Sequence, residues 1–214
     1  RFELDSEYVY FHREKGTRIH RLFADPTLSY RLEGRYGSLV PRAGFHWTGY
    51  KVSPEEATGT ATTATTERYS RRLPHASVEA RSEVARVFDW GETALRHSIG
   101  PELYYLYVPY RDQSDLPTTD TSEPPLRFDD LFDLNRFSGV DRIGDANQLT
   151  TALTSRLEAR SGATYWEAAT LRVGQIRYLR DRRVTLNDTE PETRGYSNVF
   201  AESTLRPIPG IALE

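Results

Sequence analysis

The chain of 214 residues contains no cysteine and no methionine. Without cysteine, neither a disulfide framework nor a thiolate-ligated metal site can form within the chain. Methionine is absent even from position 1, and Arg1 stands at the start of an alternating pattern. We therefore expect a piece excised from a longer protein, without a signal peptide of its own.

Long apolar runs and an excess of one charge are also lacking. No apolar run approaches the roughly 20 residues that a membrane-spanning helix needs. Lysine occurs only at Lys15 and Lys51, and the net charge is −3, which excludes a bulk basic field for nucleic acid as a partner. Only 37% of the residues are hydrophobic, yet this polarity does not exclude a transmembrane β-barrel, because lipid-facing and lumen-facing residues alternate along its strands.

What the chain does contain is a two-residue alternation of apolar and polar side chains, which is typical of half-buried β-strands. The alternation recurs in about eight segments, at residues 2–11, 18–31, 38–52, 73–90, 97–110, 147–157, 165–181 and 198–206. Gly174 interrupts one of them and marks a candidate β-bulge. No connecting segment is helical enough for a βαβ crossover, so we predict an all-β fold of antiparallel, up-and-down strands.

The connections between these segments alternate in length. Short turns lie near Gly34, Gly91 and Gly162, and long connections are predicted at residues 53–72, 111–146 and 182–195. Outer-membrane barrels have short periplasmic turns and longer outer loops, whereas a soluble meander has no such obligation. The pattern therefore favours part of a large outer-membrane β-barrel.

Two of the long connections differ in character. Residues 53–72 are rich in threonine and alanine, and we expect a mobile loop because such a composition buries too little to offset the entropy of ordering. In residues 111–146, a helical spacing relates Phe128, Leu131, Phe132 and Leu134. Loops longer than about a dozen residues are usually functional or disordered. With apolar anchors of its own, this one is predicted to be an ordered cap.

The polar faces of the predicted strands carry charges of both signs. Their candidate members are Glu3, Asp5, Glu7, Arg21, Arg42, Glu79, Arg81, Glu83, Arg156, Glu202 and Arg206. In a soluble sandwich these residues would form the solvated outer face, and in a barrel they would line a hydrated lumen. The opposite faces, rich in alanine, valine, leucine and aromatic residues, suit lipid as well as a protein core. The strand patterns alone leave both interpretations open.

Carboxylates are frequent in the 111–146 segment, at Asp112, Asp115, Asp120, Glu123, Asp129, Asp130, Asp133, Asp141 and Asp145. A glycosidase would need two of them about 5 Å or about 6.5–9.5 Å apart, one with a raised pKa, and nothing in the spacing selects such a pair. A D-x-D-x-D-G calcium loop with a distal glutamate is also absent. We expect solvated loop charges that pair with neighbouring arginines.

The histidines are scattered, at His12, His20, His46, His75 and His97. No two of them stand at the spacing of a metal-ligand pair. Neither a nucleophile elbow nor a glycine-rich phosphate loop is present. We therefore predict no catalytic residue, no metal site and no cofactor.

Three long motifs carry a family resemblance: YYLYVPYRDQSDLP from Tyr104, NRFSGVDRIGDANQLTTALTSRL from Asn135, and VGQIRYLRDRRVTL from Val173. Together with YGSLVPRAGFHWTGY before them and STLRPIPG after them, they resemble the LptD family of LPS-assembly outer-membrane proteins, also called the organic-solvent-tolerance family. The resemblance extends from Gly34 to about Pro209 and places residues 1–214 in a partial C-terminal β-barrel domain.

The resemblance implies transport and not catalysis. Members of the family insert lipopolysaccharide into the outer leaflet of the Gram-negative outer membrane, so it implies localisation in the cell outer membrane and contact with its lipid. The family's barrel is plugged by the lipoprotein LptE and is fed by the periplasmic Lpt bridge components. The family's jellyroll domain, its paired cysteines and the first and last strands of its lateral gate are missing from this chain, so we expect no transport by this piece alone.

The resemblance also carries over a set of signature residues with an expected structural role, which is to hold the large outer loop over the lumen. The set consists of Tyr110, Arg111, Asp112, Asn135, Arg136, Phe137, Gly139, Asp141, Arg142, Ile143, Gly144, Asp145, Ala146 and Asn147. Two alternatives remain. A soluble lipocalin-like β-barrel for a small apolar ligand requires inward apolar faces, and a carbohydrate-active β enzyme requires a convergent pair of carboxylates.

Overall fold

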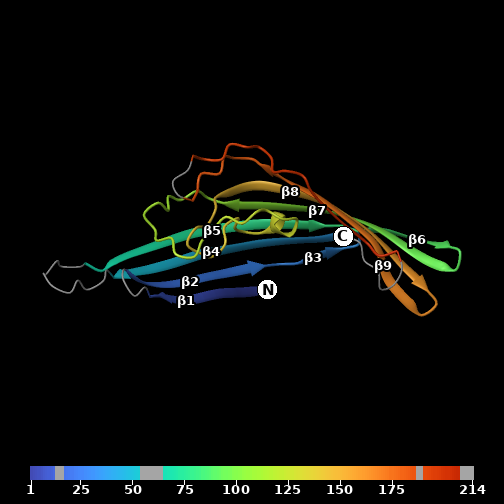
Figure 1. Ribbon diagram of the computed structural model, residues 1–214, viewed down its shortest axis with the longest axis horizontal. Coiled ribbons are helices and arrows are strands. Elements are labelled where there is room, and N and C mark those ends of the chain that lie inside the picture. The colour runs from blue at the N-terminus through green and yellow to red at the C-terminus, as the bar shows by residue number, and fades with distance from the viewer. Residues whose placement is uncertain (13–16, 54–64, 187–189, 208–214) are drawn as a thin grey trace.

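The computed structural model contains one open antiparallel sheet (Figure 1), and it describes residues 1–12, 17–53, 65–186 and 190–207. The strands are β1 (Phe2–Phe11), β2 (Arg18–Ser29), β3 (Leu32–Gly34), β4 (Gly37–Ser53), β5 (Glu67–Arg81), β6 (Val84–Trp90), β7 (Thr93–Val108), β8 (Ala146–Ser161), β9 (Thr164–Tyr178) and β10 (Phe200–Leu205). Their order across the sheet is β1-β2-β4-β5-β7-β8-β9-β10. The up-and-down antiparallel prediction is confirmed.

Two breaks change the predicted strands. At the first, β2 ends at Ser29 inside the predicted segment 18–31, and β3 follows beyond that segment as an additional short strand at Leu32–Gly34; both pair with β4. The segment at 73–90 divides into β5 and β6, which both pair with β7. At this second break Ser82 N donates to Pro101 O at 3.1 Å, so the ladder continues across the interruption.

The predicted long connections are partly corrected. β5 already begins at Glu67, so the 53–72 connection is shorter than expected, and residues 54–64, which contain most of the predicted mobile loop, lie outside the described residues. The central connection runs from residue 109 to 145. The connection predicted at 182–195 separates β9 from β10, with an isolated bridge between Arg182 and Glu192. The short turns after β6 and β8 place Gly91 and Gly162 at positive φ, as two-residue hairpins require.

The alternation in each strand separates two very different faces of the sheet. One face exposes large apolar side chains from nearly every strand, including Leu4, Leu22, Leu39, Val78, Ile99, Leu103, Leu153, Leu171 and Leu205. A lipocalin-like barrel would turn these apolar residues inward, so the structure gives no support to that alternative. Within the described ranges, no helix has the length and apolarity to cross a membrane.

The opposite face is covered by residues 109–145, referred to below as the central loop, which lies across the sheet (Figure 1, yellow). The loop contains one 3₁₀ turn, η1 (Asp129–Phe132). Phe128 and Leu131 are buried against Ile176 of β9, and Ile143 is buried with Leu106 of β7. The helical spacing and the apolar anchors of an ordered cap are therefore both present.

Gly174 of β9 does not mark the bulge that its position predicted. The register shift between β8 and β9 lies instead between Leu157 and Glu158 of β8. At Gly174, a Cβ atom would lie 2.8 Å from Leu131 Cδ1 and 3.1 Å from a ring carbon of Phe128. Because Gly174 has no side chain, Leu131 and Phe128 of the central loop can pack directly against the backbone of β9.

Candidate functional site

On the covered face, Arg21 of β2 is a fully buried side chain that binds the central loop. Its Nη1 donates to Asp120 Oδ1 at 2.6 Å and to Asp141 Oδ1 at 2.7 Å. Its Nη2 donates to Asp120 Oδ2 at 2.7 Å and to Glu7 Oε2 at 2.8 Å. The fork geometry of the guanidinium suits this bidentate pairing. One cation therefore joins β1 and β2 to two carboxylates of the central loop.

Asp141 is the most heavily bonded acid of the loop. Its Oδ2 accepts hydrogen bonds from the backbone N–H of Thr119 at 2.6 Å, from the Thr119 hydroxyl at 2.5 Å and from Asp120 N at 3.2 Å. Its Oδ1 also accepts from the Tyr50 hydroxyl at 3.0 Å. Burial by itself raises the pKa of Asp141, but the hydrogen bonds from Thr119 and Arg21 outweigh it and hold the pKa well below its ordinary value.

A second buried arginine, Arg71 of β5, holds the loop by its backbone. Its Nη1 donates to Asp141 O and to Gln113 Oε1, both at 2.8 Å. Its Nη2 donates to Val140 O at 2.6 Å and to Thr48 Oγ1 at 2.9 Å. Gln113 in turn accepts from Ile143 N at 3.1 Å. The Arg71 guanidinium thus donates hydrogen bonds to two loop carbonyl oxygens, of Val140 and Asp141, that are not paired in a β-ladder.

The second half of the signature set forms hydrogen bonds within the loop and toward the segment after β9. Arg142 donates to the carbonyl oxygens of Leu116 and Pro117 at 3.0 and 3.3 Å. The side-chain carboxylate of Asp145 accepts from the backbone N–H groups of Arg183 and Val184 at 2.9 and 2.8 Å. These bonds tie the central loop to the next connection of the chain.

The remaining signature residues surround this network. The Asn135 side chain bridges Arg142 O and Gly144 N, both at 2.9 Å, and Arg136 pairs with Glu123 and bonds Val184 O. Phe137 and Ile143 are buried, and Gly139 has a positive φ. The Arg183 guanidinium lies over the ring of Tyr110, and the Asn147 side-chain oxygen accepts a hydrogen bond from the Tyr105 hydroxyl. Ala146 is the first residue of β8, and Arg111 and Asp112 are exposed.

The prediction that the loop carboxylates are solvated is wrong for its two most important members. Asp141 and Asp145 are buried, with exposed fractions of 0% and 5%. Pairing with arginine is found for Asp120, Glu123 and Asp129, whose partners are Arg21, Arg136 and Arg172. Asp120 and Asp141 converge on the same arginine. The pKa of Asp141 is held below its ordinary value, whereas a glycosidase acid needs a raised pKa.

The predicted lumen-facing residues take part in ion pairs along the covered face. The pairs are Glu3 with Arg1, Glu7 with Arg21, Arg42 and Arg81 with Glu79, Glu83 with Arg96, Arg156 and Arg206 with Glu167, and Glu202 with Arg172. Asp5 is exposed on β1 between Glu3 and Glu7. The face is therefore a ladder of mixed charge and not a field of one sign.

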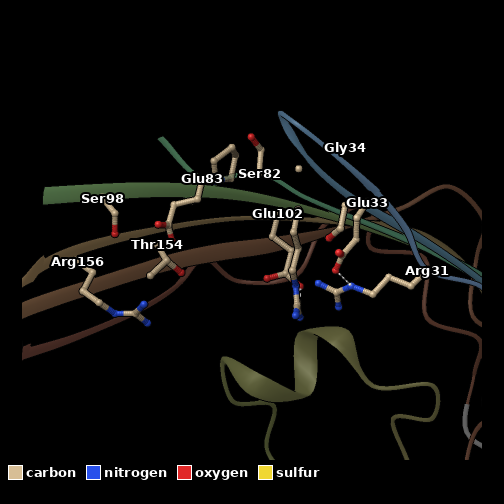
Figure 2. A pocket seen from close by; sticks show the side chains of 14 residues that line it. Arg31, Glu33, Gly34, Ser82, Glu83, Ser98, Glu102, Thr154 and Arg156 are labelled. Atoms are coloured by element: carbon tan, nitrogen blue, oxygen red, sulfur yellow. Dashed lines mark hydrogen bonds and ion pairs between the residues drawn. The ribbon is translucent and has the colours of Figure 1, made fainter. Parts of the chain in front are cut away.

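Near the short turns this ladder borders an open groove with a volume of about 570 Å³. Figure 2 shows Arg31 and Glu33 near the β3 end and Thr154 and Arg156 of β8, with Glu102 of β7 between them. Arg81 also lines the groove and pairs with Glu102 at 2.7 Å. The groove is lined by three guanidinium groups and by the carboxylates of Glu33, Glu83 and Glu102.

Sequence reasoning missed several residues of the covered face. Tyr50, Arg71, Gln113 and Thr119 all bond the loop, and none of them stands out by spacing. The histidine prediction is also corrected, since His46 and His75 lie with their ring centroids 4.7 Å apart on neighbouring strands. The pairing register of β4 and β5 brings them together, and their separation along the chain gave no indication of it.

The comparisons with known proteins agree with one another. Residues 1–214 match a family model described as LptD, LPS transport system D. The chain is 36% identical over 213 residues to the LPS-assembly protein LptD of Alkalilimnicola ehrlichii, which covers 94% of this chain and 27% of that protein. It is 38% identical over 178 residues to the LPS-assembly protein LptD of Pseudomonas aeruginosa strain LESB58, covering 81% and 18%. It thus spans about a quarter or less of the curated relatives it matches.

Proposed function

The chain belongs to the LptD family, LPS transport system D, and from that premise we propose that it is part of the outer-membrane barrel that inserts lipopolysaccharide into the outer leaflet. The reaction is transport and assembly, with no covalent step. The membrane lipid would contact the exposed apolar face of the sheet, and the lipopolysaccharide would pass on the covered, charged face. The lipoprotein LptE and the periplasmic Lpt bridge components are the partners we propose for the full-length protein.

The observation that carries this proposal is the division of the sheet into two faces. The uncovered face exposes Leu103, Leu153 and Leu171 with their neighbours, which would be costly in water but suits hydrocarbon. The other face carries arginines and carboxylates in pairs. A soluble sandwich would have the opposite arrangement, with its apolar faces packed against each other.

Lipopolysaccharide is a phosphorylated saccharide with several acyl chains, and the covered face offers chemistry for its head group. Arg31, Arg81 and Arg156 line the groove of Figure 2, and arginine binds phosphate in a bidentate manner. Their carboxylate neighbours keep the local charge balanced, so a phosphate can exchange with an existing partner. We infer that such exchange lets a charged saccharide move along the face without a deep binding minimum.

A photo-crosslinking amino acid in the full-length protein tests this assignment in cells. Placed at Ser98 or Thr154, which line the groove, it is expected to give an adduct detected with antibody against lipopolysaccharide. Ile99 and Leu153 are the matched controls, because they are neighbours on the same strands but point to the exposed face. Adducts of equal yield at all four positions, or none at the groove, would contradict the proposed path.

The structural role proposed for the signature residues predicts an assembly defect. Replacing Arg142 by alanine in the full-length protein removes the bonds to the half-buried carbonyls of Leu116 and Pro117. Replacing Asp145 by alanine removes the bonds to Arg183 N and to the buried Val184 N. We expect less assembled, protease-resistant barrel in both variants. Wild-type levels of assembled barrel in both would refute this role.

A further inference from the structure

A further cluster of titratable side chains lies on the covered face. It consists of Asp25 of β2, His46 of β4 and His75 of β5, one side chain from each of three consecutive strands of the sheet. Asp25 Oδ1 lies 2.9 Å from His75 Nε2, and Asp25 Oδ2 lies 3.2 Å from His46 Nδ1. The three side chains therefore converge on one point from three different backbones.

The ring nitrogens of His46 are buried without a hydrogen-bond partner among the described residues. Its exposed fraction is 4%, and within the described ranges neither of its ring nitrogens makes a hydrogen bond of acceptable geometry. Buried polar atoms in native proteins are nearly always paired, so an orphan of this kind calls for a missing ligand. The rings of Phe23 and His75 lie beside the ring of His46, and His46 Nδ1 faces Asp25 Oδ2.

The backbone beneath the cluster is built to admit these rings. A Cβ atom on Gly44 would lie 2.3 Å from His75 Nε2 and 2.5 Å from Thr27 Oγ1. Only glycine leaves room for the imidazole at this position of β4. Because Gly44 has no side chain, His75 can approach Asp25.

We propose that Asp25, His46 and His75 form a binding site for a divalent first-row transition cation, which joins β2, β4 and β5. Two imidazoles and one carboxylate are a donor set that zinc accepts, with a fourth position left for water. Ligand atoms at zinc distances of about 2.0–2.1 Å stand roughly 3.4 Å apart in a tetrahedron. The separations of 2.9 and 3.2 Å run from the two different oxygens of Asp25, and one ligand atom from each of the three residues lies within 4.8 Å of the other two, so the three donors are close enough to share one ion.

The surroundings allow an ion to enter and be retained. The Asp25 side chain keeps 12% of its surface exposed, whereas those of His46 and His75 keep 6% and 4%, so the carboxylate is the accessible ligand. Thr27 Oγ1 approaches Asp25 Oδ1 at 3.4 Å and helps to orient it. The ion would add a cross-link between β2, β4 and β5. The inference does not depend on what the barrel transports.

Metal binding by the full-length protein in detergent tests this site. After removal of metal with EDTA, the protein is loaded with Zn²⁺, dialysed and assayed for bound metal; Co²⁺ gives a visible spectrum for the same site. We expect wild-type protein to retain one Zn²⁺ more than the variants His75→Gln and Asp25→Asn. Their affinity should fall by at least about 100-fold, because loss of outer-shell partners alone costs up to about that factor.

His97→Gln is the matched control, because His97 bonds Ser155 on β8 and lies outside the cluster. It should retain the wild-type stoichiometry. Since a variant could fail to fold, heat-modified mobility on gels selects folded protein, and X-ray absorption of Zn²⁺-loaded wild type supplies an independent measurement. Equal Zn²⁺ content in wild type and both variants, or a zinc spectrum without imidazole scattering in wild type, would overturn the site and leave a His75–Asp25 hydrogen bond with His46 beside it.

Discussion

Replacing Asp141 by alanine is expected to release the central loop from the sheet, with a loss of about 3–5 kcal/mol of stability, the usual cost of removing one partner of a buried ion pair. The substitution leaves Arg21 with one carboxylate partner fewer and leaves the Tyr50 hydroxyl and the Thr119 N–H without this acceptor. Limited proteolysis of the full-length protein in detergent measures the effect, with cleavage expected between residues 111 and 146.

Asp115→Ala provides the control for this experiment. Asp115 belongs to the same loop but is exposed, and substitutions at such positions usually change stability by less than about 0.5 kcal/mol. Cleavage at the same rate in Asp141→Ala and Asp115→Ala would show that the Arg21 network does not hold the loop.

The same carboxylate makes a prediction for pH. Burial raises the pKa of Asp141, but the hydrogen bonds from Thr119 and Arg21 lower it by more, so the pKa is about 2, against an ordinary value of 3.8. The folded state therefore binds the proton less readily than the unfolded state, so the stabilisation is complete above about pH 4 and disappears as the pH falls toward 2. Pepsin cleavage of the loop should rise across this interval in the wild type. The rise should be smaller in Asp141→Asn, which carries no charge to titrate, and an unchanged profile would contradict the assignment.

Replacing Leu131 by alanine is expected to cost about 2–5 kcal/mol, the range for truncating a fully buried leucine. Leu131 is completely buried in the cluster with Phe128 and Ile176, and it is the part of the loop that fills the space above Gly174. Denaturant unfolding of the full-length protein, together with protease cleavage of the loop, measures this loss. Leu153→Ala is the control, because Leu153 lies on the exposed face of β8.

A double-mutant cycle sharpens this prediction. Gly174→Ala alone is expected to destabilise by about 1–3 kcal/mol, because its new Cβ would meet Leu131 Cδ1 at 2.8 Å. In Leu131→Ala the same Cβ enters vacated space, so the double variant should be more stable than the sum of the two effects predicts. Strict additivity would mean that the two positions do not touch.

The strands and the loop anchors could be predicted because their patterns are local. The two-residue alternation reports which side chains share a face, whichever strands become neighbours. Leu131 and Phe128 likewise show their burial by apolar type and helical spacing. The break at Ser82 could not be predicted, because the alternation of apolar residues continues on both sides of it and the pairing with β7 decides where β5 ends.

The buried polar residues could not be predicted for a different reason. In the sequence Asp141 resembles a solvated loop acid, and its burial is stabilised by Thr119 in the loop and by Tyr50 and Arg21, which lie 91 and 120 positions earlier. His46 and His75 stand 29 positions apart, and the register of β4 against β5 brings their rings together. Each case depends on pairing between distant segments, which composition and spacing do not encode.

The bonds of the central loop also order events in time. Arg21 and Asp141 can meet only after β2, β4 and β5 have paired in the native register, because Tyr50 and Arg71 on those strands bind the same segment of loop. Closing so long a stretch of chain has a large entropic cost that a slipped register could not recover. Docking of the loop is therefore a late step of folding that requires the native register of the strands beneath it. A sheet with a shifted register would leave the loop undocked and open to quality-control proteases.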